Sequence, residues 1–382
     1  MSPADALPRV LLITGRADIG GGPEHVLQLV DGLAGRCQLF VACPQEAPYW
    51  DRYQARLGPE RMLAIPKRRL TLAALSAVRR FVADQGIELL HSHGSAASVY
   101  SRLIGALSGV PVAHTHHGLF FVSRPGGLKR RLRLAIERLM EQATALSIFV
   151  SEGDQALARS AGFGYDKSRV IGNGVAIPAA AMPLANRAGW PLRIATVNYY
   201  NEAKNPELLL AIIAALAARA GAVPEALVEI HVYGDGDGRA AFAARLRAAG
   251  HQRFVHLHGA VPDLRERLPA HALFLSCSRW EGLPYAVIEA MAAGLPAVLS
   301  RVPGHDEILA HGIDDCGYAL SDPAAAADCL LSFQATARRQ PAGARAQAVV
   351  RQHFGIGDML DRTWAGYCDV LENALAEWQP DV

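Results

Sequence analysis

The sequence predicts an α/β protein of two domains, each built around a parallel β-sheet, and three observations lead to this prediction. A chain of 382 residues is long enough for two domains of ordinary size. Short β-rich runs alternate with helical patterns along most of the chain, which implies parallel sheets covered on both faces. A stretch rich in alanine and proline, residues 178–191, divides the alternating units into two series and is typical of a linker.

The first series opens with a strand pattern, a glycine-rich turn and a helical pattern, at residues 9–14, 18–25 and 26–33. Gly21 and Gly22 belong to the turn and let a ligand come close to the backbone, although a flexible turn without a ligand is the alternative. The turn lacks the spacing of the dinucleotide fingerprint, and no acidic residue for a ribose ends the second strand, residues 37–43. These features argue against a nicotinamide cofactor.

The alternation continues to the end of the first series. Strand patterns occupy residues 62–65, 87–93, 111–118, 146–151 and 169–174, and helical patterns occupy residues 72–85 and 96–107. Ligands bind at the C-terminal ends of strands in open α/β sheets, so polar residues at those ends are candidate site residues. Five histidines stand there: His91, His93, His114, His116 and His117.

Several roles stay open for these histidines. A metal cluster is disfavoured, because no acidic residue or cysteine falls within the usual ligand spacings. A packed, hydrogen-bonded structural role suits His91 and His114. His116 and His117 are neighbours on one strand, so their side chains are expected on opposite faces.

The second series has the same alternation. Its strand patterns are residues 192–197, 228–234, 254–259, 272–275 and 296–300, with helical patterns at 206–219 and 356–378. We therefore predict an N-terminal domain at 1–180, a C-terminal domain at 190–360 and a final helical segment at 361–382.

The stretch from Ser276 to Pro296 carries the strongest functional signal. A buried strand leads into it, Gly282 and Pro284 break the chain, and a helical pattern runs from Pro284 to Ala293. Glu281 is then in the strand-to-helix turn and Glu289 is in the helix. The first amides of such a helix bind anions, and a buried carboxylate beside them accepts paired sugar hydroxyls. The pattern indicates a site for a sugar nucleotide; an ordinary turn with two surface acids is the alternative.

This stretch resembles the Glu-x7-Glu signature of family-4 retaining glycosyltransferases, on the spacing of Glu281 and Glu289 and the flanking residues EGLPYAVIEAMAAGLPAV. The resemblance covers nearly the whole chain and is strongest from Val228 to Ile308. It implies the GT-B fold, in which two Rossmann-like domains have parallel sheets that face each other across a cleft. It also implies that the final helical segment crosses back to the N-terminal domain.

The resemblance assigns roles to residues. Glu289 would hold the ribose of the donor, Glu281 would orient the donor sugar, and Lys204 would meet the diphosphate with the backbone of Gly282, Leu283, Pro284 and Tyr285. Thr115-His-His-Gly118 is similar to the N-domain His-Gly of the family, which selects His117 as the histidine near the donor sugar. Gly21 and Gly22 would form the loop that faces the phosphate and the acceptor.

Tyr199 and the Asp235-x-Asp237 segment bear on how the diphosphate is bound. Aligned on Lys204, the phosphate-binding arginine of the family falls at Tyr199, so a bidentate phosphate partner is missing there. Asp235 and Asp237 form an Asp-x-Asp, which holds a metal in another glycosyltransferase class, but here the segment fits the Gly-x-Gly turn of the family. No metal or other cofactor is therefore expected.

The activity that the resemblance implies is retaining transfer of a sugar from a nucleoside-diphosphate sugar, with UDP favoured over GDP, to a glycan or lipid-linked acceptor in cell-surface polysaccharide synthesis. A sugar-nucleotide epimerase and a noncatalytic sugar-nucleotide-binding protein are the alternatives. An epimerase isomerises the donor without an acceptor, and a noncatalytic protein releases no nucleoside diphosphate.

Composition bounds the location and the partners. The net charge of +2 gives no global attraction to nucleic acid. Six cysteines without a Cys-x-x-Cys pair are typical of a reducing compartment, and neither a signal peptide nor an apolar run of about 18 residues is apparent. We expect a cytoplasmic protein. Residues 120–140 combine Phe120, Phe121 and Val122 with a basic amphipathic helix, which can bind an anionic membrane. The resemblance implies that this is the inner face of the cytoplasmic membrane. The alternative is that the leucine stripe of the helix faces the domain core.

Overall fold

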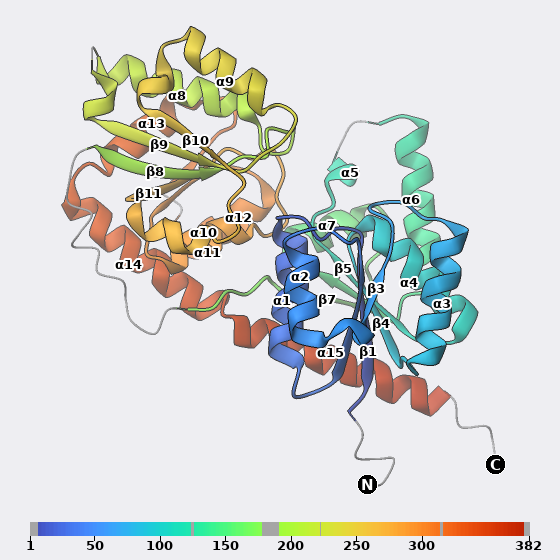
Figure 1. Cartoon of the computed structure of the whole chain (residues 1–382). Helices are drawn as coiled ribbons and strands as arrows, with labels where there is room; N and C mark the ends of the chain where they lie inside the picture. Colours follow the sequence, from blue (N-terminus) through green and yellow to red (C-terminus); the bar gives the residue numbers. More distant parts are fainter. Residues whose placement is uncertain (1–6, 124–125, 178–190, 222, 314–315, 378–382) are drawn as a thin grey trace, which may run out of the picture. The chain divides into compact units, whose positions relative to one another are not determined.

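The computed structural model describes residues 7–123, 126–177, 191–221, 223–313 and 316–377. The chain divides into two compact units (Figure 1). Unit 1 comprises Met1–Asn173 together with Gly357–Val382, and unit 2 comprises Gly174–Ile356. The predicted linker at 178–191 lies outside the described residues except for Pro191.

Unit 1 has a seven-stranded parallel sheet, ordered β3-β2-β1-β4-β5-β6-β7. The strands are β1 (Arg9–Thr14), β2 (Gln38–Cys43), β3 (Met62–Ala64), β4 (Leu89–His93), β5 (Val112–His116), β6 (Leu146–Phe149) and β7 (Ser168–Val170). The helices are α1 (Gly21–Leu33), α2 (Tyr49–Leu57), α3 (Leu72–Asp84), α4 (Ser95–Ser108), α5 (Phe120–Ser123), α6 (Leu128–Glu141), α7 (Glu152–Ser160) and the long α15 (Ile356–Glu377).

Apolar strands and helix stripes build the core of unit 1. One cluster joins β1, β2, β4 and β5 to α3 and α4, and Leu11, Ile13 and Ile104 in it are fully buried. The helix α15 lies beside α1 (Figure 1), where Leu360 leaves no room for a Cβ atom on Gly32. Tyr367 of α15 is fully buried and its hydroxyl lies 2.5 Å from Nδ1 of His91. The last helix is therefore part of the core of unit 1.

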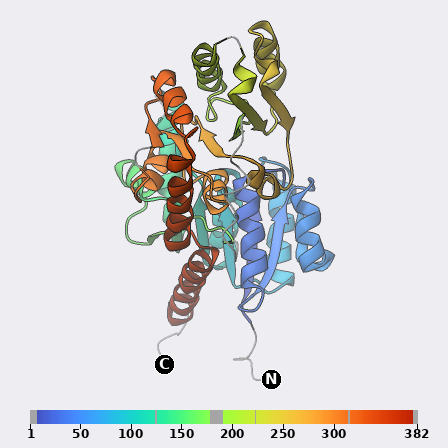
Figure 2. The ribbon, with the colours of Figure 1, turned by 90° about the vertical axis from the view of Figure 1, so that its left-hand side faces the viewer.

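Unit 2 has a six-stranded parallel sheet, ordered β10-β9-β8-β11-β12-β13. Figures 1 and 2 show helices on both faces of this sheet. The strands are β8 (Leu192–Val197), β9 (Val228–Tyr233), β10 (Val255–Gly259), β11 (Leu273–Ser276), β12 (Ala297–Ser300) and β13 (Gly317–Tyr318). The helices are α8 (Pro206–Ala220), α9 (Arg239–Ala248), α10 (Leu264–Arg267), α11 (Tyr285–Ala292), α12 (Pro303–Leu309), α13 (Pro323–Ser332) and α14 (Thr336–His353).

The predicted fold class is confirmed, since each unit is a Rossmann-like α/β unit with a parallel sheet. Two predicted boundaries were wrong by a few residues. The first helix begins at Gly21, so Gly21 and Gly22 lie in its first turn rather than in a loop. The signature helix begins at Tyr285, because Pro284 has an extended backbone with ψ of 116°.

All six cysteines are free thiols, and Cys37, Cys43, Cys277 and Cys316 are buried. Among the described residues, no helix combines the length and the apolar character needed to cross a bilayer.

Candidate functional site

Asparagine side chains shape the loop that follows β8 and carries Lys204. The Oδ1 atom of the buried Asn198 accepts a hydrogen bond from the amide of Tyr200 at 2.7 Å, and its Nδ2 donates to the carbonyl oxygen of Lys204 at 2.9 Å. Asn201 Oδ1 accepts from the amide of Lys204 at 3.0 Å. Asn205 caps α8 with a left-handed φ of 50°. These bonds fix the backbone on both sides of Lys204.

Lys204 and Glu281 form an ion pair at the C-terminal ends of the neighbouring strands β8 and β11. The Nζ atom of Lys204 lies 2.5 Å from Oε1 of Glu281, and the Ser278 hydroxyl donates to the same oxygen at 2.6 Å. The two loops are also joined through their backbones, because the amide of Arg279 donates to the carbonyl oxygen of Ala203 at 2.8 Å. The side chains are only 16% and 10% exposed, so their attraction is weakly screened.

Burial and pairing act in opposite directions on this pair. Burial raises the pKa of Glu281, but the Lys204 cation, the nearby His305 and the hydrogen bonds from Lys204 and Ser278 together hold that pKa below the ordinary value of 4.5. Burial lowers the pKa of Lys204, but the Glu281 carboxylate, together with Tyr199 and Cys277, holds that pKa above 10.5. Both groups are therefore charged at neutral pH, and a fixed cation stands where strand ends bind ligands.

His305 is a site residue to which the sequence analysis gave no role. A Cβ atom on Gly304 would overlap the carbonyl oxygen of Gly282, so glycine lets the first turn of α12 pack closely on the Glu281 turn. The next residue, His305, is fully buried, with Nδ1 2.8 Å from the carbonyl oxygen of Ser300. Its Nε2 atom is buried and has no hydrogen-bond partner in the part of the chain that the structure describes. The sequence did offer a signal for His305, because this residue follows Pro303 and Gly304 shortly after β12, the strand that pairs with β11.

Glu289 lies on α11 and is 10% exposed. The Nε atom of Arg265, from the short helix α10, donates to Oε1 of Glu289 at 2.6 Å. The sequence analysis did not anticipate Arg265. The other predicted donor residues, Gly282, Leu283, Pro284 and Tyr285, are buried in the turn that leads into α11. Unit 2 thus places one acidic residue before α11 and one within it, as the Glu-x7-Glu reading requires.

His117 belongs to a group of histidines in unit 1. Its Nε2 atom lies 3.2 Å from Nδ1 of His93, and its ring meets that of His25 edge-on at 4.9 Å between centroids. His25 comes from α1 and is bonded to Asn173 Oδ1 at 3.0 Å, and the sequence analysis did not include it. Burial holds the pKa of His117 well below 6.5, so its ring is neutral at pH 7. A neutral ring can exchange a hydrogen bond with a sugar hydroxyl.

The other strand-end histidines have structural partners. His91 bonds Thr115 Oγ1 at 2.8 Å in addition to Tyr367, and His114 bonds Ser92, so the structural reading of both is confirmed. His116 stacks on Phe149 at 4.7 Å between centroids, on a different set of side chains from those around His117. In the first turn of α1, a Cβ atom on Gly22 would meet no atom within 4 Å, so the space beside this residue is open.

The Asp-x-Asp segment forms a turn. Asp235 Oδ1 accepts a hydrogen bond from the amide of Gly236 at 2.8 Å, and both Asp235 and Asp237 are exposed. A Cβ atom on Gly236 would overlap the carbonyl oxygen of Tyr199, so this glycine is required for the two loops to meet. The Tyr199 ring faces the ammonium of Lys204, with 5.8 Å from Nζ to the ring centroid.

Replacing Tyr199 with arginine is expected to tighten donor binding or leave it unchanged. The guanidinium would bring a second cation close to Lys204, and it can bond phosphate in bidentate fashion. Calorimetric titration with a UDP-sugar tests this. Tyr199→Phe is the matched control, since it adds no charge. A large loss of affinity in Tyr199→Arg alone would contradict the prediction and indicate a specific role for the tyrosine. Arg301, the residue after β12, would be another candidate cation for the diphosphate, and its Nη1 donates to Asp306 Oδ1 at 3.1 Å.

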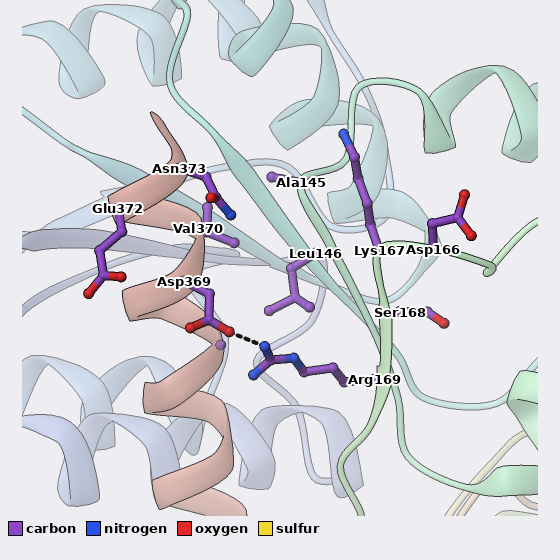
Figure 3. A pocket seen from close by; sticks show the side chains of 11 residues that line it. Ala145, Leu146, Asp166, Lys167, Ser168, Arg169, Asp369, Val370, Glu372 and Asn373 are labelled. Atoms are coloured by element: carbon purple, nitrogen blue, oxygen red, sulfur yellow. Dashed lines mark hydrogen bonds and ion pairs between the residues drawn. The ribbon is translucent and has the colours of Figure 1, made fainter. Parts of the chain in front are cut away.

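A polar pocket of about 340 Å³ lies elsewhere, in unit 1 between β6, β7 and α15 (Figure 3). An ion pair between Arg169 and Asp369 crosses it, and Lys167 and Glu372 also line it. None of the predicted site residues lines this pocket. The candidate site is therefore defined by the strand-end residues and not by this cavity.

Known proteins match both units. The family model described as Glycosyltransferase Family 4 matches residues 19–177, and the model described as Glycosyl transferases group 1 matches residues 192–335. The O-antigen biosynthesis glycosyltransferase WbnH of Escherichia coli is 23% identical over 321 residues, which cover 82% of this chain and 89% of WbnH. An Escherichia coli UDP-Gal:alpha-D-GlcNAc-diphosphoundecaprenol alpha-1,3-galactosyltransferase is 24% identical over 264 residues, covering 66% of this chain and 67% of that protein.

The fold matches as well. The structure of HepE from Anabaena, solved in complex with UDP and glucose, superposes with a TM-score of 0.79 at 17% identity, over 95% of this chain and all of HepE. The two family models together cover most of the chain, one on each unit. The chain therefore belongs to the family-4 (group 1) glycosyltransferases of the GT-B fold.

Proposed function

We propose that this glycosyltransferase moves a hexosyl group, with retention of configuration, from a nucleoside-diphosphate sugar to a glycan or lipid-linked acceptor in cell-surface polysaccharide synthesis. The observation that carries the proposal is the buried Lys204–Glu281 pair at adjacent strand ends, followed by Glu289 on α11. A UDP-sugar is favoured over a GDP-sugar, since one relative is named for UDP-Gal and HepE was solved with UDP. The names of two relatives support this acceptor class, since one is named for O-antigen biosynthesis and the other for a GlcNAc-diphosphoundecaprenol.

Each residue has one proposed task. Glu289 accepts hydrogen bonds from the ribose hydroxyls, in exchange for its bond to Arg265. Lys204 and the backbone from Gly282 to Tyr285 bind the diphosphate, and Lys204 stabilises the negative charge that grows on it as the sugar–oxygen bond breaks. Glu281 orients the sugar, while His117 in unit 1 contacts the donor sugar and Gly21 and Gly22 face the acceptor. Catalysis consists mainly of positioning and leaving-group stabilisation.

The direct test is a transfer assay with purified protein, a panel of UDP- and GDP-sugars and a lipid-linked glycan acceptor. We expect nucleoside diphosphate release that depends on the acceptor, and a product with the donor's anomeric configuration by NMR. Glu281→Gln is the matched inactive control. An isomerised sugar without acceptor would indicate an epimerase. Donor binding without release with any acceptor would indicate a noncatalytic protein.

Transfer is expected to continue in the presence of a chelator. The carboxylate of Asp235 accepts a hydrogen bond from the amide of Gly236 within the same turn. Lys204 supplies the positive charge that a metal ion would otherwise bring to the diphosphate. Initial rates should be measured at low temperature before and after chelator treatment. A loss of rate that Mn²⁺ or Mg²⁺ restores would contradict a metal-free reaction.

We also propose that α6 binds an anionic membrane surface. Its predicted apolar stripe is exposed: Leu128, Leu132 and Leu139 are 81%, 60% and 66% exposed, and Ile136 is exposed as well. The alternative, that this stripe faces the domain core, does not agree with these exposures. The inward face instead carries Leu134 and Glu137, and Glu137 pairs with the fully buried Arg102 of α4 at 3.2 Å. That ion pair fixes the rotation of α6 and turns its leucines outward.

Several apolar and basic residues in and before α6 are held by contacts within unit 1. Val122 is buried in the core of unit 1, and Phe121 packs against that core with Arg133 stacked 3.8 Å above its ring centroid. The side chain of Phe120 lies outside the described residues. Arg130 donates two hydrogen bonds to the carbonyl oxygen of Val122, the shorter at 2.7 Å. The membrane-binding surface that we propose therefore does not include these packed residues, which are Phe121, Val122, Arg130 and Arg133.

Vesicle sedimentation at low salt is expected to show reversible binding to anionic vesicles that weakens as salt is raised. The double change Leu132→Gln/Leu139→Gln should abolish it, and Lys129→Glu/Arg131→Glu should weaken it strongly, because these residues lie on the exposed part of α6. Leu72→Gln, a change at an 86% exposed leucine of α3, is the control and should leave binding unchanged. Wild-type protein that stays in the supernatant would favour a soluble acceptor.

A further inference from the structure

A second group of polar side chains lies on one face of the unit 2 sheet at its β10 edge. Glu229 and His231 are two residues apart on β9, so their side chains share a face. His256 on the edge strand β10 is the register partner of His231. Glu229, His231 and His256 are all only half-buried, so ions in solution have access to this face.

We propose that Glu229, His231 and His256 bind a divalent transition-metal ion, with Zn²⁺ as the best fit. Each residue offers one ligand atom, and the three atoms lie within 4.8 Å of one another. Two imidazole nitrogens and one carboxylate oxygen are a ligand set that Zn²⁺ prefers. Ligand atoms around tetrahedral zinc are roughly 3.3 Å apart, so these side chains need to close by about 1.5 Å at most. Their half-exposed positions allow that rotation.

His231 uses Nδ1 in a hydrogen bond, and its Nε2 atom faces Glu229. Its Nδ1 lies 2.9 Å from Nε2 of His258, and its Nε2 lies 3.6 Å from the nearest carboxylate oxygen of Glu229, too far for a hydrogen bond. Within the described ranges, Nε2 of His231 is buried and has no hydrogen-bond partner. When His231 donates its Nδ1 proton to His258, the lone pair of Nε2 faces a carboxylate, and a cation between them satisfies both.

The neighbours orient the ligands as outer residues do in zinc sites. A metal-bound histidine usually donates its other ring proton. Nε2 of His258 lies 2.9 Å from Nδ1 of His231, where it would accept that proton once Nε2 of His231 binds the ion. Arg193 Nε donates to Oε2 of Glu229 at 3.0 Å and holds the carboxylate. His271 is also near, with its ring 4.9 Å from that of His231, but its nitrogens contact Arg267 and Tyr233. His271 therefore lies next to the proposed metal site but is not one of its ligands.

The position of the site indicates a structural ion. Glu229 and His231 lie within β9, whereas Lys204 and the Gly236 turn come after the strand ends. The register of β9 and β10 shifts between Leu257 and Gly259, so the edge strand is irregularly paired there. An ion bound to both strands would hold that edge. This inference does not depend on which sugar or acceptor the enzyme uses.

The test is metal titration of the full-length protein after removal of bound metal. We expect calorimetry to give one Zn²⁺ per chain, Co²⁺ to give the visible absorption of a tetrahedral site, and Zn²⁺ to raise the melting temperature. His256→Gln should lower the Zn²⁺ affinity at least about tenfold, and His258→Gln, which removes an outer residue, should lower it about 10- to 100-fold. His251→Gln, at a histidine that packs on Phe254 outside the group, is the matched control and should bind like the wild type.

Circular dichroism of each variant without metal separates lost binding from lost folding. Should His256→Gln fail to fold, the wild-type Co²⁺ spectrum still decides the question. Absence of Zn²⁺ and Co²⁺ binding by the wild type would overturn the proposal. Equal losses in His251→Gln and His256→Gln would overturn it as well.

Discussion

Replacing Glu289 with alanine is expected to lower kcat/KM for the sugar-nucleotide donor at least about tenfold. The carboxylate is 10% exposed, so a ribose bound to it is largely shielded from water, and the lost hydrogen bonds cannot be replaced by solvent. Initial rates of nucleoside diphosphate release at varied donor concentration measure the effect. We expect both a higher donor KM and a lower kcat.

Arg265 provides the control for this variant. Glu289→Ala also removes the partner of Arg265, whose side chain is 43% exposed and can be hydrated instead. Arg265→Gln removes the same ion pair while it keeps the carboxylate, so its donor KM should stay within a few-fold of the wild type. Wild-type kinetics in a well-folded Glu289→Ala variant, or an equal loss in Arg265→Gln, would contradict the role of Glu289.

Replacing Lys204 with methionine is expected to destabilise unit 2 by about 3–5 kcal/mol, because the Glu281 carboxylate stays buried without its cation. Donor binding should also be lost. Urea unfolding measures the first effect and calorimetry the second. The double variant Lys204→Met/Glu281→Gln should recover much of the stability and none of the activity. A double variant as unstable as the single one would show that the cost is not due to the unpaired carboxylate.

The same pair predicts a pH dependence. The pKa of Glu281 is lowered by pairing, so its contribution to stability is present above pH 4.5 and is lost as the pH falls below that value. The pKa of Lys204 is raised, so its contribution is present below pH 10.5 and is lost as the pH rises above it. The stability difference between the wild type and Lys204→Met should be largest between these values and should shrink at acid pH.

The sequence predicted the parts of the fold that have a local signal. Apolar strands between helical patterns located β8, β9, β11 and β12, and Gly282 with Pro284 marked the turn before α11. The helix α14 was not predicted, because Pro341 lies inside it and its apolar pattern is weak.

Contacts between distant segments had no local signal. The partner of Glu289 comes from α10, and the buried Glu137 that turns the leucines of α6 outward pairs with Arg102 on α4. Likewise, Glu229 and His231 alternate with apolar residues on β9, but His256 joins them only through the register of β9 with β10. Such pairings depend on tertiary packing, which residue spacing does not contain.

The route of the chain has a consequence for synthesis on the ribosome. The chain enters unit 2 at Gly174 and leaves it at Ile356, and these ends are adjacent: the amide of Ile356 donates to the carbonyl oxygen of Val175 at 3.1 Å. Unit 2 is thus a continuous segment whose own core is complete when Ile356 has been made, whereas unit 1 still lacks α15. Until Tyr367 emerges, Nδ1 of His91 lacks the hydroxyl that it contacts in the finished protein, and the hydrophobic surface that α15 covers is open. Most of unit 1 is therefore synthesised before unit 2, but unit 1 can finish folding only after unit 2 has been made. A nascent chain stalled before α15 should bind chaperones more strongly than the finished protein does.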